Sequence, residues 1–168
     1  MDKNFLDGKK LRILKEFVGN NNGLTLLSMN QCRLGEEGAF FIAVGLAKNK
    51  KLRTLILSGN NIKDAGLNAF SDNLARSGYS LAHLDLSNNT ISDDGATRFA
   101  RSLTSNRSLQ SLNFKGNQIG RDGGMALRES VGQHPYLLKL YLESNAVQVR
   151  DIEEIDRILR RNRDEKTK

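Results

Sequence analysis

The sequence predicts an α/β solenoid with an inner parallel sheet and outer helices, and three observations lead to that fold class. A Leu-x-x-Leu-x-Leu pattern recurs five times along the 168 residues, with starts 28 or 29 residues apart. Within each unit the apolar period changes from two to about 3.6, as expected for a strand followed by a helix. Hydrophobic residues make up only 38% of the chain, which suits a stack of narrow repeats that each bury a thin layer. The length accommodates one domain.

Each repeat is expected to begin with a short strand whose apolar side chains alternate toward the interior. The pattern opens at five leucines: Leu24, Leu52, Leu81, Leu109 and Leu137. Eight residues after each leucine comes a small or amide side chain, which can hydrogen-bond the backbone of the turn that leaves the strand. These residues are Cys32, Asn60, Asn89, Asn117 and Asn145. Cys32 in this position is expected to be structural rather than reactive.

A helix is predicted in the second half of each repeat. Each helix carries an apolar i, i+4 pair, which makes one stripe along its surface: Ile42/Leu46, Phe70/Leu74, Phe99/Leu103, Leu127/Val131 and Ile155/Leu159. A glycine stands near the start of four helices, whereas Asp151 takes that position in the fifth. Acidic residues at or before the helix starts are expected to act as caps and to meet the positive end of the helix dipole.

The two ends of the stack are predicted to be caps. Residues 1–23 are expected to form an N-terminal cap, with a helix over 5–18 and a turn at 20–23. Five repeats fill residues 24–162, and the last helix, at about 151–162, is expected to close the core. Residues 163–168 are predicted to be a charged tail.

These repeats resemble leucine-rich repeats, specifically those of the ribonuclease-inhibitor-like subfamily. The resemblance covers residues 24 to about 162 and rests on the repeat length and on the helix openings DAGL at 64–67 and DDGA at 93–96. Cys32 in the asparagine position also fits the resemblance, because that subfamily accepts either residue there. The resemblance implies a right-handed α/β horseshoe that binds other proteins through its concave sheet and adjoining loops.

The outward positions of the strands hold the candidate binding residues. The N-terminal end of the predicted concave face is uncharged and exposes Leu26 and Ile56, while Tyr141 lies among charged residues at the C-terminal end. The full set is Leu26, Ile56, His83, Asp85, Asn113, Lys115, Lys139, Tyr141 and Glu143. Aromatic and charged side chains together on an exposed sheet suit a contact patch for a protein partner. The alternative is that these residues are simply exposed to solvent and have no binding role.

No catalytic, metal or cofactor site is predicted. His83, Asp85 and Ser111 could form a Ser/His/Asp grouping on neighbouring strands. A flat open sheet, however, supplies neither an oxyanion hole nor a pocket that excludes water. One cysteine and two histidines exclude a multi-cysteine zinc site, and no glycine-rich segment carries the lysine of a phosphate-binding loop. We therefore expect a non-enzymatic scaffold.

The net charge of +7 raises the question of polyanion binding. The basic residues are dispersed along the sequence, and the one dense cluster, at 160–163, is expected to meet the negative end of the last helix. Because aromatic residues that could stack on bases are scarce, nucleic-acid binding is not expected. No segment reaches the ~20 apolar residues of a membrane span. The lone thiol and an N-terminus without a signal-like run favour a cytoplasmic location, with the nucleus left open. The chain is also expected to be a monomer.

Two alternative functions stay open. The first is a regulator of a small GTPase, suggested because the resembled subfamily includes the activator of the Ran GTPase. Asn61, Asn88 and Gln118, on the loops after the strands, could serve there but are also ordinary turn residues. The second is a ligand-sensing fragment of a larger receptor, against which the caps at both ends argue.

Overall fold

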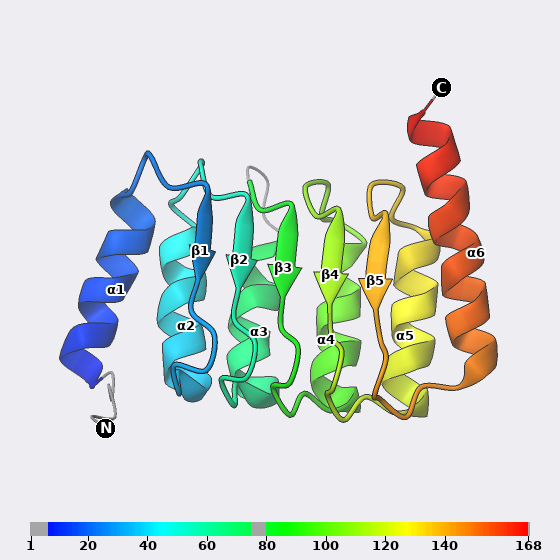
Figure 1. The fold of residues 1–168 in the computed structure, drawn as a ribbon, viewed down its shortest axis with the longest axis horizontal. Helices are drawn as coiled ribbons and strands as arrows, with labels where there is room; N and C mark the ends of the chain where they lie inside the picture. Colours follow the sequence, from blue (N-terminus) through cyan, green and yellow to red (C-terminus); the bar gives the residue numbers. More distant parts are fainter. Residues whose placement is uncertain (1–6, 75–79, 168) are drawn as a thin grey trace.

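The computed structural model describes residues 7–74 and 80–167, which form a single row of strand–helix repeats (Figure 1). Its elements in chain order are α1 (Gly8–Asn20), β1 (Leu26–Ser28), α2 (Gly35–Leu46), β2 (Thr54–Ile56), α3 (Lys63–Leu74), β3 (His83–Asp85), α4 (Asp93–Leu103), β4 (Ser111–Asn113), α5 (Arg121–Gly132), β5 (Lys139–Tyr141) and α6 (Val149–Lys166). The strands form one layer, helices α2–α5 form a second layer behind it, and α1 and α6 flank the ends. The predicted α/β solenoid is confirmed.

All five strands are parallel and lie in chain order. Their central residues pair in one straight row: Leu27, Leu55, Leu84, Leu112 and Leu140. Every member of the row except the partly buried Leu27 is buried against the helices. The constant repeat length explains this register, because the same position of each repeat stacks on its counterpart in the next.

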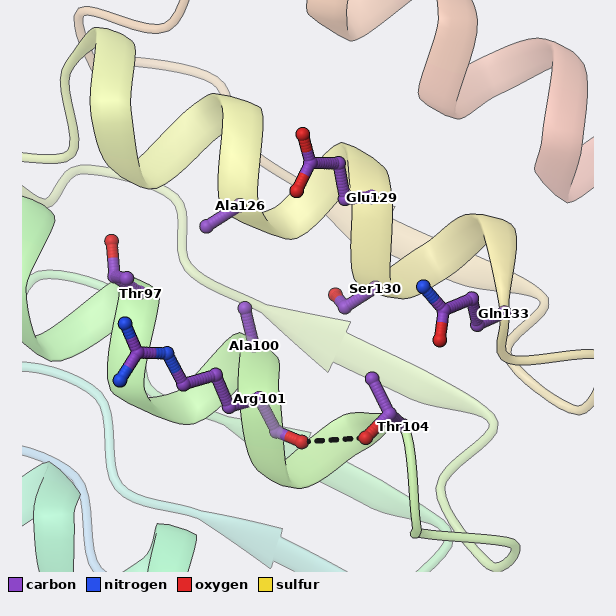
Figure 2. Close-up of a pocket in the computed structure, with 8 residues that line it drawn as sticks. All are labelled: Thr97, Ala100, Arg101, Thr104, Ala126, Glu129, Ser130 and Gln133. Atoms are coloured by element: carbon purple, nitrogen blue, oxygen red, sulfur yellow. Dashed lines mark hydrogen bonds between the residues drawn. The ribbon is translucent and has the colours of Figure 1, made fainter.

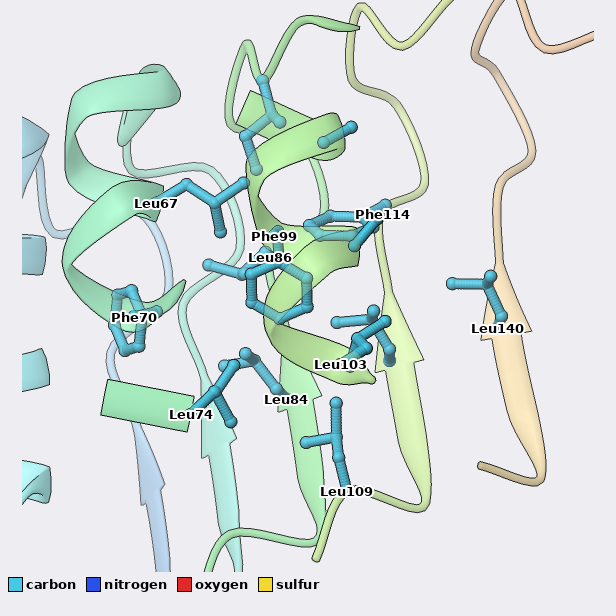
Figure 3. Packing of buried hydrophobic residues seen from close by; sticks show 14 of the residues in the cluster. Leu67, Phe70, Leu74, Leu84, Leu86, Phe99, Leu103, Leu109, Phe114 and Leu140 are labelled. Atoms are coloured by element: carbon cyan, nitrogen blue, oxygen red, sulfur yellow. The ribbon is translucent and has the colours of Figure 1, made fainter. Parts of the chain in front are cut away.

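The core is one continuous apolar layer between the sheet and the helices. All ten residues of the predicted helix pairs are buried. Phe99 on α4 and Phe114 after β4 meet edge to face with ring centroids 5.3 Å apart, in the middle of the layer shown in Figure 3. The same cluster extends from Val18 on α1 to Leu159 on α6, so both end helices share the core of the repeats.

The amides that follow the strands hydrogen-bond the backbone, as predicted, and their bonds also connect neighbouring repeats into a ladder. Asn89 Nδ2 donates to the carbonyl oxygens of Leu57, in the preceding repeat, at 2.9 Å and of Ser87 at 3.0 Å. Its Oδ1 accepts the backbone N–H of Asn60 at 2.8 Å. The same pattern recurs at Asn60 and Asn117. Asn145 Nδ2 likewise donates to Phe114 in the preceding repeat, but its Oδ1 accepts the N–H of Ile119. Each amide therefore joins its own turn to the preceding repeat.

The structure also contains a second row of polar side chains, in the connectors before the strands, which was not predicted. Asn49 Nδ2 donates to the carbonyl of Val18 at 2.6 Å, and its Oδ1 accepts the N–H of Leu52 at 2.7 Å. Asn106 makes the equivalent bonds two repeats later. His134 takes this position in the next connector. These residues are spaced by one or two repeat lengths. This spacing is the sequence signal that could have predicted the row.

Acidic residues near the helix starts reach across to the next repeat. Asp93 Oδ1 accepts the N–H groups of Gly120 at 2.6 Å and Gly123 at 2.8 Å, at the start of α5. Asp64 Oδ1 likewise accepts the N–H of Ser92 at 2.8 Å, just before α4. The predicted capping by acidic side chains is therefore present, but these two residues cap the following helix rather than their own.

Glycine near the helix starts lets adjacent helices approach closely. A Cβ on Gly66 would lie 3.0 Å from the Cβ of Ala39 on α2, so no larger residue fits there without a shift. In α6 this position holds Asp151, which is fully buried. Its Oδ1 accepts from Nη1 of Arg128 on α5 at 2.8 Å. This ion pair fills the space between α5 and α6, and α6 is inclined to the other helices (Figure 1).

The N-terminal cap is a helix, with bounds that differ from those predicted. Helix α1 begins at Gly8 and ends at Asn20, and the side chain of Asp7 caps it by accepting the N–H of Lys10 at 2.9 Å. Phe5 and Leu6, predicted to start this helix, lie outside the described residues. The predicted turn is held by Asn21, whose Oδ1 accepts the N–H of Leu24 at 2.7 Å.

The predicted end of the last helix near residue 162 is wrong, because α6 continues to Lys166. Residues 163–166 are therefore helical rather than part of a tail. Asn162 Nδ2 donates to the carbonyls of His134 and Leu137, both at 2.9 Å, and Arg163 Nη1 donates to the carbonyl of Leu138 at 2.7 Å. These bonds anchor the extra turn against the connector before β5. No helix within residues 7–74 and 80–167 has the length and apolar character needed to cross a bilayer.

Candidate functional site

Helices α2–α5 cover one face of the sheet and leave the other face open (Figure 1). The predicted binding residues of the strands flank the central leucines that pack against the helices, so their side chains lie on the open face. Alternate residues of a strand point to the same face, and the register aligns them in rows. One row consists of Leu26, Thr54, His83, Ser111 and Lys139; the next consists of Ser28, Ile56, Asp85, Asn113 and Tyr141. Lys115 and Glu143 follow the strands two residues beyond the second row. We call the surface formed by these twelve residues the open sheet face.

The N-terminal end of the open sheet face is apolar. The side chain of Leu26 on β1 is 50% exposed, and that of Ile56 on β2 is half-buried. Two aliphatic side chains presented to water on adjacent strands give a partner an apolar area to cover. This end carries no charged residue in its strands.

The centre of the face is a hydrogen-bonded polar network. Asp85 Oδ1 accepts from the hydroxyl of Ser87 at 2.7 Å, and its Oδ2 accepts from Nδ2 of Asn113 at 3.1 Å. The Ser87 hydroxyl also lies 2.9 Å from that of Ser58. Because both carboxylate oxygens of Asp85 are engaged, the network holds the side chains of three strands in fixed positions.

The Ser/His/Asp grouping is not assembled into a catalytic relay. His83 and Ser111 are register neighbours, but the side-chain hydrogen bonds of Asp85 among the described residues go to Ser87 and Asn113. His83 is exposed on the open sheet. The arrangement therefore lacks the oriented histidine that a nucleophilic serine requires.

The C-terminal end carries exposed charged and aromatic side chains. Tyr141 is 39% exposed, and Lys115, Lys139 and Glu143 are all exposed around it. A shallow hollow of about 190 Å³ extends across the face from β2 to β5. Its lining includes Ile56, His83 and Tyr141, so the hollow joins both halves of the open sheet face.

A second hollow, of about 220 Å³, lies on the helical side between α4 and α5 (Figure 2). Small side chains such as Ala100 and Ala126 line it together with Arg101 and Glu129. Thr104 Oγ1 donates to the carbonyl of Arg101 at 2.8 Å, closing the end of α4. None of the predicted binding residues contributes to this hollow.

The residues considered for GTPase regulation lie along the edge where the helices begin. Asn61, Asn88 and Gln118 are exposed. Asn61 Oδ1 accepts from the hydroxyl of Thr90, whereas Asn88 Nδ2 lies 3.5 Å from the hydroxyl of Ser58. The structure therefore does not bring these amides together in one cluster. Across the described ranges, His, Cys, Asp and Glu form no group of three suited to a metal ion.

The comparisons with known proteins agree with the repeat pattern. The leucine-rich repeat family matches residues 48–71, 80–100 and 105–127. Bovine NACHT, LRR and PYD domains-containing protein 5 is 32% identical over 111 residues, which are 66% of this chain and 10% of that protein. Pig ribonuclease inhibitor is 30% identical over 110 residues, 66% of this chain and 24% of the inhibitor. RAN GTPase-activating protein 2 of Arabidopsis thaliana is 27% identical over 135 residues, 80% of this chain and 25% of that protein.

Solved structures give the same fold. Leiomodin-1 Actin-Binding Site 2 superposes with a TM-score of 0.81 at 21% identity, covering 91% of this chain and 89% of that one. The tropomodulin C-terminal domain from Caenorhabditis elegans gives a TM-score of 0.77 at 15% identity, covering 92% and 94%. The chain belongs to the leucine-rich repeat proteins, and its repeats are of the ribonuclease-inhibitor-like type. It spans between a tenth and a quarter of the length of the curated relatives described above.

Proposed function

We propose that this chain is a non-enzymatic interaction module that binds a protein partner through the open sheet face and its adjoining loops. The observation that carries the proposal is the exposure of Leu26 and Tyr141 at opposite ends of one face. Backbone pairing and the amide ladder hold both residues in place. Because such a surface is ordered before binding, association costs little conformational entropy. The proposal includes a monomeric chain in an intracellular setting, consistent with the free thiol of Cys32.

The first test is a double variant at the C-terminal end of the face. Tyr141→Ala with Lys115→Glu should weaken binding to a partner, first identified by affinity purification and mass spectrometry. It should leave the melting temperature nearly unchanged, because both side chains are exposed. The expected loss is roughly tenfold or more in Kd, the size typical of removing an exposed aromatic contact and reversing a charge. Isothermal titration calorimetry measures it.

A matched control makes the same two kinds of change away from the open sheet face. Tyr136 lies in the connector before β5 and Arg121 at the start of α5, and both are exposed. Tyr136→Ala with Arg121→Glu should leave the affinity unchanged. Undisturbed affinity in the Tyr141/Lys115 variant would refute the proposed surface.

The second candidate is regulation of a small GTPase, favoured by the similarity to RAN GTPase-activating protein 2 along 80% of this chain. Its polar residues would be Asn61, Asn88 and Gln118, whose exposure leaves them accessible. Measuring GTP hydrolysis by a panel of small GTPases with and without this chain separates the two functions. Stimulation that disappears in Asn88→Ala would favour the regulator over the binding module.

A further inference from the structure

The fold sorts charge onto two opposite edges. Every helix runs in the same direction, so the helix ends fall on one long edge of the molecule and the helix starts on the other (Figure 1). Connectors 21–25, 47–53, 104–110 and 133–138, on the helix-end edge, hold five basic residues and no acidic ones. We call these five residues the basic rim: Lys48, Lys50, Lys51, Arg53 and Arg107.

The opposite edge is predominantly acidic. The first turns of helices α2–α6 contain seven acidic residues: Glu36, Glu37, Asp64, Asp93, Asp94, Asp122 and Asp151. This sorting partly follows from the helix dipole, which favours cations at helix ends and anions at helix starts. Arg107 acts in that way, because its Nη1 donates to the carbonyls of Thr104 at 2.8 Å and Asn106 at 2.9 Å.

Lys51 and Arg53 are less easily explained by the dipole, because they stand next to β2 rather than at the end of α2. The guanidinium of Arg53 donates to the carbonyl of Ser80 at 2.9 Å. Neither residue belongs to any ion pair in the described part of the chain. Both are exposed, so their positive charges are available to a ligand.

These two residues adjoin the apolar end of the open sheet face. Arg53 directly precedes Thr54, and Thr54 is the register neighbour of Leu26. Leu26 and Ile56 present their aliphatic side chains to the solvent at that place. The structure thus places Lys51 and Arg53 in the connector that leads into β2, next to the strands that carry Leu26 and Ile56.

We infer that this juxtaposition is one composite site for an acidic polypeptide segment. Carboxylates of the segment would lie against Lys51 and Arg53, and an apolar side chain would cover Leu26 and Ile56. The inference rests on the proposed function, since it takes the partner to be a protein, and it adds the chemistry of that partner. A polypeptide fits better than a nucleic acid because the aliphatic half offers no aromatic platform for a base.

The test uses defined polymers as probes for the intact chain. A fluorescein-labelled random copolymer of glutamate and tyrosine is compared with polyglutamate of the same length, by fluorescence anisotropy. We expect the copolymer to bind more tightly than polyglutamate, and its affinity to fall with salt. Lys51→Glu with Arg53→Glu should weaken both probes by roughly tenfold or more. Leu26→Ser should weaken only the copolymer.

The matched control reverses two charges at the other edge. Lys9→Glu with Arg121→Glu changes the net charge by the same amount, and both residues are exposed. This control should bind the copolymer almost as the unaltered chain does, and circular dichroism melting should show that all variants remain folded. Equal losses in the two double variants would overturn the composite site, as would tighter binding of single-stranded polyuridine than of the copolymer.

Failure of this inference is distinguishable from failure of the proposed function. In one outcome, Tyr141→Ala with Lys115→Glu abolishes partner binding, whereas Lys51→Glu with Arg53→Glu leaves the binding of both the partner and the copolymer intact. That outcome refutes the composite site alone. A partner retained by both variants refutes the proposed function as well.

Discussion

His134 is the clearest single residue whose chemistry follows from its position in the stack. Its Nδ1 accepts the backbone N–H of Leu137 at 2.9 Å, so Nε2 carries the proton of the neutral ring. That Nε2 atom is buried and has no hydrogen-bond partner among the described residues. Burial lowers the pKa of His134 from 6.5 to about 4, because the charged ring would lose its hydration.

This depressed pKa predicts acid sensitivity. Above about pH 6.5 the ring is neutral in both the folded and the unfolded chain, so the folded state bears no penalty. As the pH falls from about 6.5 toward 4, the unfolded chain binds a proton that the folded chain does not, and up to about 3 kcal/mol of stability is lost. Urea denaturation at a series of pH values measures this loss.

The control for that experiment is His134→Asn. Asn106 holds the equivalent turn in its own repeat through an amide oxygen, so asparagine should keep the turn without titrating. Subtracting the two pH profiles isolates the histidine from the carboxylates elsewhere. Superimposable profiles between pH 4 and 6.5 would contradict the assignment.

The role of a single residue could be predicted from the sequence where the same side chain serves the same role in every repeat. The turn-supporting role of Asn60, Asn89 and Asn117 could be predicted because an amide both donates and accepts at a constant distance from the strand. Their bonds to the preceding repeat needed the structure. Asn49 and Asn106 did not stand out in the sequence, because polar residues are common in turns. Only an alignment of the connectors with one another shows that they occupy the same position. The rows on the open sheet face followed from strand alternation, but the hydrogen bonds of Asp85 depend on three strands and needed the structure.

At the scale of elements, α6 differs from the other helices because a charge pair replaces a glycine. Asp151 is fully buried, and Arg128 is its partner at 2.8 Å. The sequence showed that Asp151 breaks the glycine pattern, but it did not show the arginine, which comes from a different repeat. The end of α6 was likewise unpredictable, because its last turn is held by tertiary hydrogen bonds from Asn162 and Arg163.

Removing Arg128 should destabilise the C-terminal end of the stack. Arg128→Met leaves the buried carboxylate of Asp151 without its close partner, which costs about 3 kcal/mol or more of unfolding free energy. The matched control is Arg98→Met, which removes an exposed pair with Asp72 at 3.0 Å and should cost less than about 1 kcal/mol. Chemical denaturation measures both. Similar small losses would show that solvent already screens the Asp151 charge.

At the scale of the whole molecule, the repeat period determined the architecture and the structure added the distribution of charge. A constant 28- or 29-residue period is sufficient to predict strand order and register, because each repeat can only stack on its neighbours. The +7 charge, by contrast, looked dispersed along the chain. Its sorting into a basic rim and an acidic edge becomes visible when the connectors are grouped by the edge of the stack on which they lie.

The stack should be more sensitive to a cavity in its middle than to one at its end. Leu84→Ala opens a hole in the central strand, where the side chain is 2% exposed, and should cost about 2–5 kcal/mol. Leu27→Ala, in the partly buried first strand, should cost less, because packing surrounds that residue incompletely. Urea midpoints and slopes report both losses. Equal losses would argue against nearest-neighbour stacking as the source of stability.

The amide ladder also makes the stack directional. The Oδ1 atom of Asn89 satisfies the N–H of Asn60, in the repeat before it, and Asn117 in turn satisfies Asn89. Each turn thus depends on its successor for an acceptor. Deleting a repeat from the C-terminal side would remove the acceptor of a backbone N–H in the turn left behind. Deletion from the N-terminal side would instead remove the partners of an asparagine side chain. Lengthening or shortening such an array is therefore not a symmetric operation, and its final turn is the one that most needs a substitute for the missing neighbour.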